Sequence, residues 1–204
     1  MSAVPLIFTS GWASGINSYA VVLLMGLLGR YAHMGSVPPT LERTDVLVVA
    51  AVLFGGQFVV GKIPYVDSVW DAVHTLIRPA MGAAIAALMA GHAHSLSQAV
   101  AASIGGGTAL VTHLIKSGVK LGVNTSPEPV SNIVVSLLED LVVAGIVVLA
   151  LLHPLAAAII AAVLLVIGVI LVIALARRIR RAWRNRRERR RQRQSGAVPA
   201  PSQR

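Results

Sequence analysis

Charged residues are missing from more than half of this 204-residue chain. The runs without Asp, Glu, Lys or Arg are residues 1–29, 46–61, 79–115 and 141–176. Only 13% of all residues are charged, where soluble domains average about 25%. Because about 20 apolar residues cross a bilayer as a helix, these runs predict a polytopic membrane protein and exclude a water-soluble enzyme.

Cysteine is also absent, which excludes disulfides, thiolate metal sites and cysteine nucleophiles. The sequence contains no Gly-x-Ser-x-Gly and no His-Glu-x2-His motif. We therefore expect neither an enzyme within the membrane nor a metal or cofactor. The N-terminus, Met-Ser-Ala-Val-Pro, lacks the basic residues of a cleaved signal peptide.

Prolines, glycines and charges divide the hydrophobic sequence into six segments. The helices expected from them lie within residues 12–33, 46–61, 76–91, 97–120, 131–152 and 154–176. The predicted fold is an all-α transmembrane helical bundle of about six spans over residues 1–176. Residues 177–204 form an Arg-rich cytoplasmic tail that is disordered at its end. Three spans followed by three also permit a 3+3 inverted repeat.

The basic residues predict the orientation. With six spans both termini share a side, and that side receives Lys62, Arg78, Lys116, Lys120 and the twelve arginines of the tail. Only Arg30 and Arg43 fall on the other side, so the positive-inside rule places both termini in the cytoplasm. Arg outnumbers Lys 15 to 3, a bias common in bacteria, and we expect a multi-pass protein of the bacterial inner membrane.

Residues 64–79, PYVDSVWDAVHTLIRP, carry the most regular polar pattern. The side chains that share one face of a helix here are Asp67, Asp71, His74 and Arg78. One interpretation is an amphipathic helix on the cytoplasmic surface, anchored by Trp70. The other is a stripe that faces protein and binds a cation or relays protons.

Two acids interrupt the fifth segment. Glu139 and Asp140 precede the His153-Pro154 turn by 13 to 14 residues, about 20 Å of helix, which places them inside the hydrocarbon layer. Acids at this depth are expensive and are candidates for function. Alternatively, Ser136 caps the start of this helix and leaves both acids at the interface.

The fourth segment carries partners for these acids. His113, Lys116 and Lys120 lie close enough in helical projection for the lysines to pair with Glu139 and Asp140. The alternative is that both lysines reach out to the lipid headgroups.

Glycines mark the first and fourth segments. Gly11, Gly15, Gly118 and Gly122 form two Gly-x3-Gly pairs, which predict close packing of these two helices or a homodimer. Residues 105–107, Gly-Gly-Gly, could instead be unwound backbone that lines a cavity.

The basic tail predicts contact with lipid. We expect anionic headgroups to bind Arg177, Arg178, Arg180, Arg181 and Trp183. No series of stacking aromatics interleaves the arginines, so we expect no nucleic acid partner.

Three strings resemble a known bacterial membrane family, Domain of Unknown Function 4126. They are SGINSYAVVLLMGLLGR, KIPYVDSVWDAVHTLIRP and NTSPEPVSNIVVSLLEDLVVAG, and the resemblance spans about residues 10–150. The family carries no assigned activity, so the resemblance implies important positions and no mechanism. These positions are Gly15, Asn17, Asp67, Trp70, Asp71, His74, Arg78, Pro79, Pro127, Ser131, Glu139 and Asp140.

Two classes of function remain. The first is a transporter or channel-like protein for a small ion or solute, with an acidic polar site that faces the cytoplasm. The second is a non-catalytic scaffold or accessory subunit of a membrane complex. Solvent access distinguishes them: polar residues around one wet cavity favour transport, and dry, fully paired residues favour the scaffold.

Overall fold

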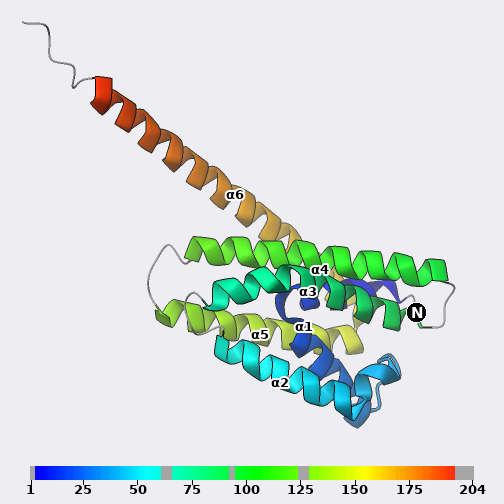
Figure 1. The fold of residues 1–204 in the computed structure, drawn as a ribbon. Helices are drawn as coiled ribbons and strands as arrows, with labels where there is room; N and C mark the ends of the chain where they lie inside the picture. Colours follow the sequence, from blue (N-terminus) through cyan, green and yellow to red (C-terminus); the bar gives the residue numbers. More distant parts are fainter. Residues whose placement is uncertain (1–2, 61–65, 92–94, 124–128, 196–204) are drawn as a thin grey trace, which may run out of the picture.

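The computed structural model describes residues 3–60, 66–91, 95–123 and 129–195. It confirms the all-α class and contains six α-helices and one short 3-10 helix, η1 (Figure 1). Their bounds are α1 Val4–Ala32, η1 Pro39–Glu42, α2 Thr44–Val60, α3 Val66–Met89, α4 Ser95–Val123, α5 Pro129–Leu152 and α6 Pro154–Ser195. The predicted disorder at the tail end falls on residues 196–204, outside the described part.

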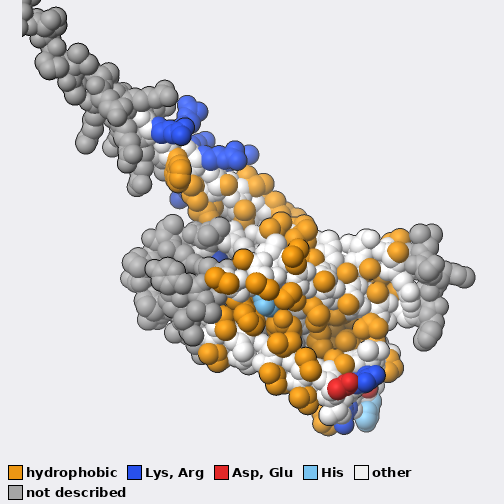
Figure 2. All heavy atoms as spheres, viewed as in Figure 1, with side chains coloured by type: hydrophobic (Ala, Val, Ile, Leu, Met, Phe, Trp, Pro, Cys, Tyr) orange, Lys and Arg blue, Asp and Glu red, His pale blue; other side chains and the backbone are white. Residues whose placement is uncertain are grey.

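The surface of the bundle is apolar. Within the described residues, four helical segments are long and apolar enough to cross a membrane: Val4–Ala32, Val69–Met89, Ser97–Lys120 and Pro154–Arg181. Hydrophobic side chains cover much of the face shown in Figure 2, and basic side chains gather on α6 beyond its apolar part. Such an exterior indicates a membrane protein, because a soluble protein rarely exposes an apolar surface of this extent.

The first helix does not cross the bundle. Its backbone leaves helical geometry at Asn17, where φ is −151° and ψ is 92°. At one end of α1, Val4 lines a cleft together with Ser97. Just beyond the other end, residues 35–40 line a second cleft together with Gly91 and Gln98. Both ends of α1 therefore lie where α3 meets α4, and α1 is a re-entrant hairpin that turns at Asn17 (Figure 1).

The hairpin separates the N-terminus from the basic tail. Along α6, Gly168 packs on Ile115 and Val172 packs on Gly118, so α6 passes the C-terminal end of α4 before Arg177. The N-terminus and the basic tail thus lie at opposite ends of the bundle (Figure 1). The six predicted helices are present, but α1 has the length of a span and turns back within the bundle.

Glycines let the hairpin approach α4 closely. A Cβ added to Gly11 would lie 2.6 Å from the Gly105 carbonyl oxygen, and one added to Gly15 would collide with the Ala109 carbonyl. Gly118 instead packs against Val172 of α6, so the second glycine pair does not mark a contact with α1. The surroundings of Gly122 lie outside the described part.

The fourth helix is continuous through residues 105–107. The predicted unwinding at these glycines is therefore wrong, and the broken backbone is in α1. A 3+3 repeat would relate α1 to α4. It is not shown, because α1 breaks at Asn17 whereas α4 is a continuous helix.

Candidate functional site

The polar stripe of α3 faces the interior of the bundle. His74 and Arg78 are buried, whereas Val69 and Leu76 are exposed on the opposite face. The interpretation as a surface helix is therefore wrong. Trp70 is not a surface anchor, because its ring stacks on His74 with 4.6 Å between centroids. Asp67 lies in α3, and its side chain is outside the described part.

The break in α1 redirects backbone hydrogen bonds. In a continuous helix the Ala20 N–H would donate to the Ile16 carbonyl, but here it donates to Asn17 Oδ1 over 3.1 Å. Asn17 thus acts as the N-cap of the second half of the hairpin. Its amide nitrogen Nδ2 donates to Asp140 Oδ1 over 2.9 Å.

The carbonyls before the break accept hydrogen bonds from side chains. Ser18 Oγ donates to the Ser14 carbonyl over 2.7 Å. Arg78 Nη1 donates to the Gly15 carbonyl over 3.3 Å, and Lys116 Nζ donates to the Ile16 carbonyl over 3.1 Å. A membrane interior offers no water to satisfy these groups, so the two cations stabilise the turn.

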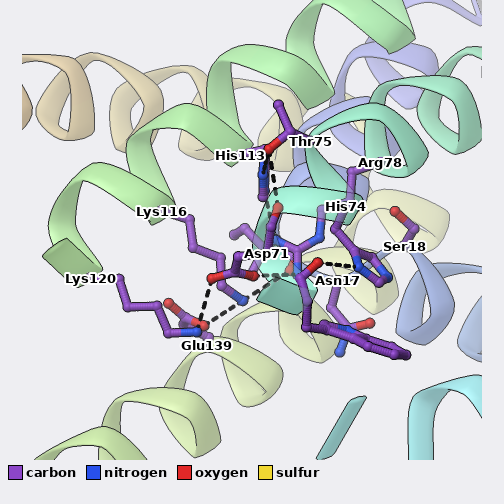
Figure 3. A network of polar contacts seen from close by, with 12 residues as sticks. Asn17, Ser18, Asp71, His74, Thr75, Arg78, His113, Lys116, Lys120 and Glu139 are labelled. Atoms are coloured by element: carbon purple, nitrogen blue, oxygen red, sulfur yellow. Dashed lines mark hydrogen bonds and ion pairs between the residues drawn. The ribbon is translucent and has the colours of Figure 1, made fainter. Parts of the chain in front are cut away.

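Ion pairs join α3, α4 and α5 beside the turn (Figure 3). Lys116 Nζ lies 2.7 Å from Glu139 Oε2, and Lys120 Nζ lies 3.0 Å from Asp71 Oδ2. Arg78 Nη2 lies 3.5 Å from Asp71 Oδ1. We call this set the apex cluster; its residues are Asn17, Asp71, His74, Arg78, His113, Lys116, Lys120, Glu139 and Asp140. Its three basic side chains balance its three acidic ones.

The neighbours of His113 determine its tautomer. Arg78 Nη1 lies 2.8 Å from His113 Nδ1, and because a guanidinium only donates, Nδ1 must accept. Nε2 therefore carries the proton and donates to Thr75 Oγ1 over 3.1 Å. Thr75 in turn donates to the Asp71 carbonyl over 3.1 Å. This chain of donors keeps His113 neutral beside Arg78.

His74 has partners at both ring nitrogens. Its Nδ1 donates to the Trp70 carbonyl over 2.7 Å, and its Nε2 lies 3.0 Å from the Tyr19 hydroxyl, which donates to it when the ring is neutral. Tyr19 belongs to the second half of the α1 hairpin. This bond therefore ties that half to α3.

The solvent exposure of the side chains increases from one end of the apex cluster to the other. The exposed fraction of the side chain rises from 1% for Arg78 to 9% for Lys116 and 25% for Glu139. Lys120 and Asp71 are also partly exposed. The cluster thus opens toward the end of the bundle where the basic tail emerges. The two clefts described above lie at the other end, beside Gly91 and Ser97.

Sequence reasoning missed some members of this arrangement and mispaired others. Ser136 does not cap the helix, because α5 begins seven residues earlier, at Pro129. Lys116 pairs with Glu139, but Lys120 pairs with Asp71 rather than with an acid of α5. Thr75 carried no signal, whereas Asn17 was among the positions that the family resemblance implied.

The predicted tail residues lie apart from the apex cluster. Arg177, Arg178, Arg180, Arg181 and Trp183 are exposed on α6, which stays helical beyond them. Nothing in the described structure covers these side chains. Among the described residues no group of three His, Asp or Glu side chains is placed to hold a metal ion.

Comparison with known proteins identifies one family. No curated protein and no solved structure matches the chain. The family described as Domain of unknown function (DUF4126) matches residues 4–174, from the first residue of α1 to the last apolar turns of α6. Since this match covers most of the sequence, the chain belongs to the DUF4126 family.

Proposed function

We propose that the protein is a small transporter or channel-like protein for an ion or solute, and that the apex cluster is its polar site. The observation that carries this proposal is the turn of α1. Non-helical backbone at membrane depth is tolerated only where it is buried in protein or lines a water-filled cavity. Many transporters bind their substrates at such broken helices.

The position of the turn supports this role. Residues 4–16 make about 20 Å of helix, so Asn17 lies well inside a hydrocarbon layer of about 30 Å. The turn brings backbone carbonyls into contact with Arg78 and Lys116, and the amide of Asn17 into contact with Asp140. Charged groups at this depth usually mark ion or substrate pathways.

The proposed orientation follows from the basic residues. The end of the bundle with Lys120 and the arginine tail faces the cytoplasm, and Val4 faces outward. In this orientation Glu139 and Lys120 form the cytoplasmic entrance of the site. The two clefts beside Gly91 and Ser97 lie toward the outer surface. We place the protein in a bacterial inner membrane, with the tail on anionic lipid headgroups.

A scaffold or accessory subunit is the second candidate. The pairing within the apex cluster favours it, because its three basic side chains contact Asp71 and Glu139, and Asp140 accepts from Asn17, all without a ligand. In that case the cluster serves only to hold the hairpin, or joins a partner or a second copy.

Flux into liposomes separates the two candidates. The full-length protein is reconstituted and tested with a panel of ions and small solutes, using empty liposomes as the baseline. We expect flux that falls at least tenfold in Glu139→Gln, while Asp45→Asn, an exposed carboxylate at the other end, keeps the wild-type rate. No flux above empty liposomes across the panel would favour the scaffold.

A further inference from the structure

The surroundings of Lys116 have the composition of a cation site. Its ammonium nitrogen lies 3.1 Å from the Ile16 carbonyl oxygen and 2.7 Å from Glu139 Oε2. One oxygen comes from the broken backbone and the other from a carboxylate. Unwound carbonyls coordinate cations at the broken helices of transporters.

We propose that these oxygens form a binding site for a monovalent cation of the ammonium class, a small protonated primary amine. The side chain of Lys116 fills this site in the present structure, and the cargo takes its place. The inference rests on the proposed transport function and names its substrate class.

The small number of oxygens at Lys116 favours an ammonium group over a divalent metal. Ca²⁺ takes oxygen ligands at about 2.3–2.6 Å and Mg²⁺ at about 2.0–2.1 Å, and each needs six or more of them. The oxygens around Lys116 are spaced for N–H donors of an ammonium. A monovalent guest also preserves the charge on this side of Glu139 when the lysine withdraws.

Lys116 is better suited to leave than Arg78. The guanidinium of Arg78 is buried and contacts the Gly15 carbonyl, His113 and Asp71. Lys116 has a flexible stem, and its partner Glu139 lies at the wetter end of the cluster. Withdrawal of the lysine toward that end would free both oxygens for the guest.

The test uses methylammonium as the probe and thermal unfolding in detergent as the readout. Lys116→Met removes the internal ammonium and leaves both oxygens available. We expect methylammonium chloride, tenfold above its Kd, to raise the Tm of this variant by about 3 to 6 °C. Tetramethylammonium chloride, which has the same charge but no N–H donor, should give no rise. The matched control is Lys116→Met with Glu139→Gln, which should not respond to either salt.

Equal shifts with both salts, or an undiminished shift in the double variant, would overturn the inference. If Lys116→Met does not fold, equilibrium binding of radiolabelled methylammonium to wild-type protein decides instead. We expect saturable binding that is lost in Glu139→Gln and kept in Asp45→Asn, and its absence from wild type would overturn the site. Flux of other solutes without methylammonium binding would overturn this inference and leave the transport proposal standing. Methylammonium binding without any flux would support the site and remove the transport role.

Discussion

One side-chain amide joins the turn of α1 to the middle of α5: Asn17 Nδ2 donates to Asp140 Oδ1 over 2.9 Å, while Asn17 Oδ1 accepts from the Ala20 N–H. The two ends of the amide are chemically distinct, and each faces the partner it requires. A residue with only donors or only acceptors cannot fill this position. Asn17 therefore caps the second half of α1 and also fixes the turn against α5.

This bond predicts a specific rescue. Asn17→Asp keeps the cap but places one carboxylate against another, so we expect a loss of at least about 2 kcal/mol in unfolding free energy. Adding Asp140→Asn restores a donor opposite the new carboxylate and should recover most of the loss. The measurement is chemical unfolding in detergent for the two single variants and the double variant. A double variant no more stable than Asn17→Asp would show that the two side chains are not coupled.

The re-entrant hairpin predicts which residues share a side of the membrane. Because the natural chain has no cysteine, single cysteines can be introduced without further changes. Val4→Cys and Ser36→Cys should react with a membrane-impermeant maleimide from one side, and Trp183→Cys from the other. Labelling of Val4→Cys from the same side as Trp183→Cys would mean that α1 crosses the membrane.

The pairing of Lys116 with Glu139 predicts non-additive variants. Lys116→Met should cost about 2 to 3 kcal/mol, somewhat below the cost for a fully buried pair, because Glu139 is partly exposed. Removing both charges should cost less than the sum of the single changes. The exchanged pair, Lys116→Glu with Glu139→Lys, should be the least stable of the series, because it places a carboxylate against the Ile16 carbonyl. An exchanged pair as stable as wild type would show that the carbonyl does not matter.

The donor chain through His113 predicts a distinction between threonine variants. Thr75→Val leaves the His113 Nε2 proton without its acceptor and should cost about 1 to 3 kcal/mol. Thr75→Ser keeps the hydroxyl and should stay within about 1 kcal/mol of wild type. Thermal unfolding of the two variants in the same detergent makes the comparison. A loss in Thr75→Val no larger than in Thr75→Ser would show that the hydroxyl contact with His113 adds little stability.

The basic part of α6 predicts a separable lipid interaction. Removing residues 177–204 should weaken association with anionic liposomes, since each basic residue near such a surface contributes about 1 kcal/mol. Flux should remain, because the deleted residues lie apart from the apex cluster. Flotation with neutral and anionic liposomes measures the first effect. Equal flotation of both proteins on anionic liposomes would argue against the tail as a lipid anchor.

Charge in an apolar sequence was the informative signal for the site. Long uncharged runs are interrupted or bordered by Lys116, Glu139 and Arg78. Because an unpaired charge inside a membrane has a high free-energy cost, the burial and pairing of these side chains could be predicted. The same pattern did not predict which side of α3 faces inward. An amphipathic helix has one periodicity whether its polar face meets water or the interior of a bundle. Only the neighbouring helices, here through Tyr19 and His113, decide between the two.

The turn of α1 was beyond prediction for a different reason. Residues 4–32 are apolar and uncharged over most of their length, which is the signature of a crossing helix. What favours the break is the supply of donors for its carbonyls, and these donors are Arg78 and Lys116. They lie 63 and 100 residues along the chain from their acceptors. No local window contains both the broken backbone and the groups that satisfy it.

The hairpin also implies an order of assembly. Each half of α1 makes about 20 Å of helix, too short to cross about 30 Å of hydrocarbon alone. The partner of Asn17 on α5 is 123 residues further along the chain and leaves the ribosome long after α1. The turn of α1 can therefore gain these contacts only after α3, α4 and α5 have been made. Packing of the hairpin against them is a late step of folding.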